Sequence, residues 1–96
     1  MRTFDQVIET LRDAIADPER IPAAFRDLYD FTLLDEQGLS RLPEPVQDIL
    51  TDLAYDLDYY EPDPRARQES PSFYGPRRAA ELIEAALSEL RREGAV

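Results

Sequence analysis

The residues of this 96-residue chain whose types and spacing could do chemistry are carboxylates that recur along one segment. Asp48, Asp52 and Asp56 follow one another at intervals of four, so on a helix of 3.6 residues per turn they share one face. Like charges at this spacing destabilise a helix by roughly 0.2–0.5 kcal/mol per pair. Local stability therefore does not explain the row, whereas a partner that supplies positive charge would.

More acids and several aromatic rings surround this row. Aromatic side chains are frequent anchors of protein interfaces, and they can also receive a cation over the ring face. We therefore predict a protein-binding site of eight residues: Asp48, Asp52, Tyr55, Asp56, Asp58, Tyr59, Glu61 and Asp63. The alternative role for the tyrosines is packing in the core. Tyr60 and Phe73 would then hold a long loop against the helix ends.

The negative charge of the chain is concentrated in its middle. Residues 27–63 hold eleven acids and one arginine, a net charge of −10, and the remaining residues balance to zero. A one-sided charge of this kind attracts a cationic partner and repels phosphate, so we expect a protein partner and no nucleic acid. The alternative is a solvated helix face, but such faces usually mix both signs, as the arginines and glutamates of residues 77–91 do.

Other kinds of site find little support. The chain has no cysteine and no histidine, which removes the usual nucleophile, general base and metal ligands. Counted as a calcium loop from Asp56, position six is Glu61 where glycine is needed, and position twelve is Arg67 where glutamate is needed. No glycine-rich phosphate loop or metalloprotease motif is present. We expect no enzyme activity, no catalytic residue, no metal and no cofactor.

Hydrophobic periodicity supplies the elements that must position the acids. Apolar residues recur at three- and four-residue intervals in four segments, each with a capping or proline signal near its start. We expect helices at about 4–16, 22–35, 44–59 and 76–93, a stop at Gly38, and a proline-rich loop at 61–75. In the second helix the buried side should run through Ala24, Phe25, Leu28, Phe31 and Leu34.

The expected fold is all-α, a small antiparallel four-helix bundle that makes residues 1–96 one domain. No alternation typical of strands is present. The N-terminus does not resemble a signal peptide and no segment is apolar enough to span a membrane, so we expect a cytoplasmic protein without a membrane partner. The oligomeric state is left open, with a monomer favoured.

The run L-x-x-L-x-x-D-L-x-x-Y-x-P-D from Leu50 to Asp63, followed by a charged loop and a last amphipathic helix, resembles the colicin D-type immunity proteins of the colicin immunity domain family. The likeness covers roughly Leu50 to Leu90, and Glu61-Pro62-Asp63 is its most specific part. The N-terminal half and the prolines Pro64, Pro71 and Pro76 depart from it.

This resemblance implies a small four-helix protein that blocks a toxic RNase by placing carboxylates over its cationic, tRNA-binding active site. Glu61 and Asp63 match the motif by position, and Asp52 and Asp56 fit the same role by charge. The expected function is thus that of an immunity protein for a basic nuclease toxin, an RNase or tRNase of the bacteriocin or contact-dependent type, as in a toxin–antitoxin pair. The alternative is an acidic helical adaptor or regulator that mimics nucleic acid to a transcription or repair protein.

Overall fold

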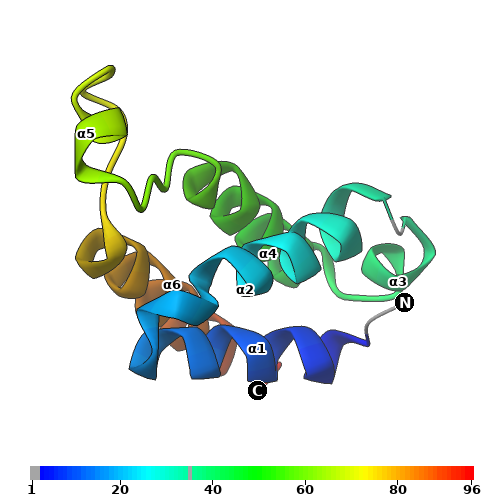
Figure 1. Cartoon of the computed structure of the whole chain (residues 1–96). Coiled ribbons are helices and arrows are strands. Elements are labelled where there is room, and N and C mark those ends of the chain that lie inside the picture. Colours follow the sequence, from blue (N-terminus) through cyan, green and yellow to red (C-terminus); the bar gives the residue numbers. More distant parts are fainter. Residues whose placement is uncertain (1–2, 35) are drawn as a thin grey trace.

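The computed structural model of the protein describes residues 3–34 and 36–96, with the backbone alone for Glu36 (Figure 1). This part of the chain holds six α-helices and no strand, which confirms the all-α class. The elements in order are α1 (Phe4–Ala16), the 3₁₀-helix η1 (Pro18–Arg20), α2 (Ile21–Tyr29), the π-helix η2 (Asp30–Leu34), α3 (Glu36–Ser40), α4 (Glu44–Leu57), α5 (Pro64–Arg67) and α6 (Pro76–Arg92).

The helices begin where local chemistry favours it. At the start of α1 the Thr3 hydroxyl accepts from the Gln6 N–H at 3.2 Å and the Gln6 side chain accepts from the Thr3 N–H at 2.9 Å, a reciprocal capping box. A proline occupies the first turn of η1, α2, α4, α5 and α6, where its missing N–H would have no helical partner in any case.

The core lies between the four longer helices. α1 packs against α2 and α6, and α4 packs against α6 and α2. Each helix buries one apolar side, as the stripe pattern predicts, because a helix of this length is not stable alone in water. The largest side chains that are almost fully buried are Val7, Leu11, Ile21, Leu28, Val46, Leu50, Leu57, Ile83 and Leu90.

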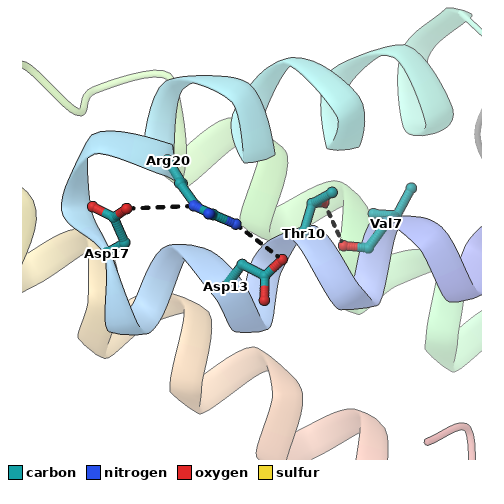
Figure 2. Close-up of polar contacts among 5 residues, drawn as sticks. All are labelled: Val7, Thr10, Asp13, Asp17 and Arg20. Carbon is teal, nitrogen blue, oxygen red and sulfur yellow. Dashed lines mark hydrogen bonds and ion pairs between the residues drawn. The ribbon is translucent and has the colours of Figure 1, made fainter.

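The corner from α1 into α2 is held by polar contacts (Figure 2). The Arg20 guanidinium lies 3.5 Å from an Asp13 carboxylate oxygen and 3.3 Å from one of Asp17. One helical turn earlier, the Thr10 hydroxyl donates to the Val7 carbonyl at 2.8 Å. All three charged side chains are substantially exposed, so these ion pairs fix the geometry of the corner more than they stabilise the fold.

The second predicted helix, 22–35, changes type in its second half. It is α-helical over Ile21–Tyr29 and then π-helical, with the Thr32 hydroxyl donating to the Leu28 carbonyl at 2.9 Å. A wider π turn shifts the phase of the residues that follow. Phe31 and Thr32 are therefore buried, whereas Leu34 is 70% exposed and its predicted burial is wrong. The expected end at Asp35 lies outside the described residues.

Two segments that we predicted to be irregular contain short helices. Gly38 is not a stop, because it lies inside α3; a glycine costs a helix interior only about 1 kcal/mol, which packing of Leu39 and Leu42 on the core offsets. The 61–75 loop contains α5, whose Asp63–Pro64 start combines an N-cap with a first-turn proline. A first-turn proline also marks α2, α4 and α6, but here no apolar stripe follows it.

The ends of the two helices that flank this loop differ slightly from expectation. α4 ends at Leu57 rather than 59, and α6 ends at Arg92, with Gly94 in the left-handed region at φ 73° as a typical helix terminator.

α5 projects from the helical body at the end away from α3 (Figure 1), and the molecule measures 40 × 24 × 20 Å. Within the described residues, no helix combines the length and the apolar character that a membrane crossing requires.

Candidate protein-binding site

Helix α4 carries the acidic row predicted from the sequence. Its buried side faces α2 and α6 through Val46, Leu50, Leu53, Ala54 and Leu57. The row lies outside this buried side and is open to solvent, since three aspartates four residues apart share one face of the helix. Asp48, Asp52 and Asp56 are all exposed, and so is Asp58, which follows the last turn.

Within the described part of the chain, these carboxylates form no ion pair. Within residues 3–34 and 36–96 the ion pairs join Arg20 to two aspartates of the α1–η1 corner, and Arg77 and Arg78 to Glu81. None of them involves an acid of the predicted site. Asp56 and Asp58 also lie at the C-terminal end of α4, where the helix dipole disfavours negative charge. Ion pairs within the described residues therefore do not neutralise the charge of this row.

The structure divides the tyrosines into two groups. Tyr55 is 60% exposed and Tyr59 is 49% exposed, so both rings are available beside the acidic row. Tyr60 and Tyr74 are half-buried and pack against the core, with their ring centroids 6.4 Å apart. The first pair could contact a partner, and the second pair holds the fold together.

Tyr74 ties the 61–75 segment to the end of α4. Its hydroxyl donates to the Asp56 backbone carbonyl, its N–H donates to the Tyr59 carbonyl at 3.2 Å, and its own carbonyl accepts from the Glu61 N–H at 2.9 Å. Burial, assisted by the nearby charge of Asp56, raises the pKa of the Tyr74 phenol to about 12. The folded state thus favours the neutral phenol, which holds the backbone in place at the C-terminal end of α4.

Glu61 and Asp63, the two acids that match the immunity-protein motif, have local structural roles. Asp63 is the N-cap of α5, with its carboxylate accepting from the Arg65 N–H at 2.9 Å. The Glu61 carboxylate accepts from the Asp63 N–H at 3.3 Å. Asp63 remains exposed and Glu61 is partly buried, so Asp63 is better placed than Glu61 to meet a partner while it caps the helix.

A groove runs along one edge of the acidic row, between α4 and α6. Its volume is about 210 Å³, and Asp52 and Asp56 stand on its α4 side. Glu89 of α6 stands on the other side, and Ile49, Leu53, Leu82, Ala85 and Ala86 complete the lining. Sequence reasoning placed Glu89 on a mixed-charge surface, because nothing in the local pattern tells which side of α6 faces α4.

The arrangement can accept hydrogen bonds and attract cations. In the part of the chain that the structure describes, no group of three or more histidine, cysteine, aspartate or glutamate side chains is placed to hold a metal ion. Carboxylates spaced along a helix, next to exposed rings and a groove with a partly apolar lining, are suited to contact a basic protein surface.

Comparison with known proteins identifies no relative. No family model matches the chain, and no curated protein or solved structure is significantly similar to it.

Proposed function

We propose that this protein is an immunity protein that binds a basic nuclease toxin and covers its active site with the acidic face of α4. The observation that carries the proposal is the row of exposed carboxylates at Asp48, Asp52 and Asp56, which lies on a core-packed helix and takes part in no ion pair of the described residues. The resemblance of Leu50–Leu90 to colicin D-type immunity proteins points in the same direction.

The physical reason lies in what a nuclease must bind. Its cleft is cationic because it receives phosphates, and regularly spaced carboxylates can occupy the same positions. Opposed fields also speed association, which an inhibitor of a toxic enzyme requires. Tyr55 and Tyr59 add exposed aromatic area next to the carboxylates, as interface anchors do.

The fold and setting that go with this function are part of the proposal. The four longer helices form an antiparallel bundle of one domain, supported by the packing of α1 on α2 and α6 and of α4 on α2 and α6. A rigid bundle presents the row without an ordering cost on binding. The protein acts in the cytoplasm as a monomer, where the toxin would otherwise cleave RNA.

The first test is capture from a lysate of the source cells at low and high salt, with bound proteins identified by mass and assayed for RNA cleavage. A basic nuclease that is retained at low salt, released at high salt and inhibited by the protein supports the proposal. Recovery of a transcription or repair factor instead would replace it with the nucleic-acid-mimicking regulator.

Charge reversal on α4 tests which face binds. Asp52→Lys or Asp56→Lys should weaken binding of the captured nuclease by about 2–5 kcal/mol, because each places a cation against a cationic cleft. Glu84→Lys is the matched control: it changes the net charge equally from an exposed position on α6 that lines a different groove, against α1. Full affinity in both α4 variants, in binding measured by calorimetry, would discard this face as the site.

A further inference from the structure

The groove between α4 and α6 is lined by both apolar and acidic side chains. Apolar side chains of both helices form part of its lining, with Ile49 and Leu53 from α4 and Leu82, Ala85 and Ala86 from α6. Carboxylates stand at both of its sides, Asp52 and Asp56 on α4 and Glu89 on α6. An occupant must therefore be apolar along its length and positive at its end.

The acids at the groove are free to bind. Asp52, Asp56 and Glu89 are exposed, and no ion pair within the described residues involves any of them. Asp52 and Asp56 are one helical turn apart, which places their β-carbons roughly 5–6 Å from each other. Two carboxylates at this separation, with a third across the groove, suit a planar donor with several N–H groups.

We propose that the groove receives an arginine side chain of the partner, with its aliphatic stem on the apolar lining and its guanidinium between the carboxylates of α4 and α6. Long basic side chains commonly bury their stems while the charged head stays in a polar setting. Arginine suits the site better than lysine because its rigid fork of donors can bind more than one carboxylate at once. A volume of about 210 Å³ admits a side chain rather than a whole helix.

This inference rests on the proposed function for the positive charge of the partner, and it adds a residue that the acidic row does not include. Glu89 belongs to α6, and its role depends on the packing of α6 against α4. If the groove binds arginine, removing the Glu89 charge must matter more than removing any equally exposed charge elsewhere on α6.

The probe is an alanine-based helical peptide that carries arginines on successive turns, titrated into the isotopically labelled protein and followed by NMR. We expect saturable binding at low salt, with amide shifts centred on Ile49, Leu53, Leu82 and Ala85. The same peptide with citrulline in place of arginine should bind at least about tenfold more weakly, since it lacks the charge. A lysine peptide should fall between them. Equal binding of all three peptides, no saturable binding, or shifts centred elsewhere would overturn the proposal.

Two glutamates of α6 provide a matched pair of variants. Glu89→Gln should weaken binding of the arginine peptide by about tenfold or more, because it removes one charge-assisted contact. Glu84→Gln removes the same charge from a position in the groove between α6 and α1, and it should change binding only slightly. Equal losses in the two variants would mean that only the overall field matters, and the arginine site would be rejected.

Failure of this inference can be told apart from failure of the proposed function. If a nuclease is captured and inhibited but Glu89→Gln leaves its affinity unchanged, the function stands and the groove assignment falls. If the arginine peptide binds in the groove but no nuclease is captured, the groove assignment stands and the function falls. Ala85→Phe, which places a ring at the exposed edge of the groove, gives an independent block of the arginine peptide.

Discussion

The tyrosines that lie near the end of α4 have different roles although they lie close together in the structure. Tyr55 and Tyr59 leave about half or more of their surface in solvent, whereas Tyr74 reaches back across the loop to the Asp56 carbonyl. A phenol that is partly buried needs a hydrogen-bond acceptor, and the last turn of a helix offers carbonyls without helical partners. The hydroxyl of Tyr74 therefore stabilises the fold, while those of Tyr55 and Tyr59 are left for solvent or a partner.

Removing the Tyr74 hydroxyl should weaken the fold and alter its response to alkali. Tyr74→Phe should lower the free energy of unfolding by about 1 kcal/mol at neutral pH, because it loses one hydrogen bond. The pKa of Tyr74 is raised from 10.0 to about 12, so the folded state holds the phenol proton more tightly than the unfolded chain does. The stability that comes from Tyr74 is fully present below pH 10 and is lost as the pH rises toward about 12.

Denaturant unfolding measured across this pH range checks both parts. The wild type should lose stability between pH 10 and about 12, and Tyr74→Phe should lose less over the same interval. Tyr55→Phe is the control, because it removes a hydroxyl from an exposed ring. If the two variants unfold at the same denaturant concentration, the bond from Tyr74 to Asp56 does not stabilise the fold.

At the scale of an element, α4 is a helix whose surface works against its own stability. Its apolar side fixes it against α2 and α6, but its exposed side repeats one charge on successive turns and places more acid near its C-terminus. A helix selected for stability alone would carry opposite charges at these positions, as α6 does where Arg77 and Arg78 contact Glu81. The row is therefore better explained by the proposed binding role than by helix stability.

Neutralising the row should therefore stabilise the protein while it abolishes partner binding. Asp48→Asn, Asp52→Asn and Asp56→Asn combined remove two like-charge pairs, which should raise the free energy of unfolding by about 0.4–1 kcal/mol at low salt. Thermal melting reports the gain, and calorimetry with the captured nuclease reports the loss. A triple variant that is less stable than the wild type would mean that these aspartates make favourable contacts in the native fold.

The whole molecule separates its charge, with a net −10 in residues 27–63 and balance in the rest. Arginines collect at the far end of the acidic segment, where Arg67, Arg77 and Arg78 line a cavity of about 460 Å³. Gly75 permits this packing, because a β-carbon there would clash with the Arg67 guanidinium in its present position. The molecule thus has a strongly acidic middle and a locally basic corner. Under the proposed function, this charge distribution orients the cationic toxin toward α4.

Salt should act in opposite directions on folding and on binding. Raising the salt from about 0.01 M to 0.15 M shortens the screening length from about 30 Å to about 8 Å, so repulsion among the acids weakens and the melting temperature should rise. The same change should slow association with the captured nuclease. The triple asparagine variant should gain less from salt than the wild type does; an equal gain would show that the repulsion lies elsewhere in the chain.

The sequence by itself determined the helices and the charge they carry. The starts of α1, α4 and α6 depend on caps, prolines and apolar spacing within a few residues, so local patterns suffice to find them. The segregation of acids into residues 27–63 is likewise a property of the sequence. The sequence pattern did not predict the short helices α3 and α5, because a periodic apolar pattern becomes visible only over several turns.

Only the tertiary structure decided how the site is completed. The position of Glu89 across the groove from Asp52, the contact of Tyr74 with Asp56, and the exposure of Leu34 after a π turn all depend on which helix faces meet. The first two depend on contacts between residues that are distant in sequence. The third depends on how a packed helix is rotated about its axis. Local propensity does not encode such relations, because they follow from how the whole core packs.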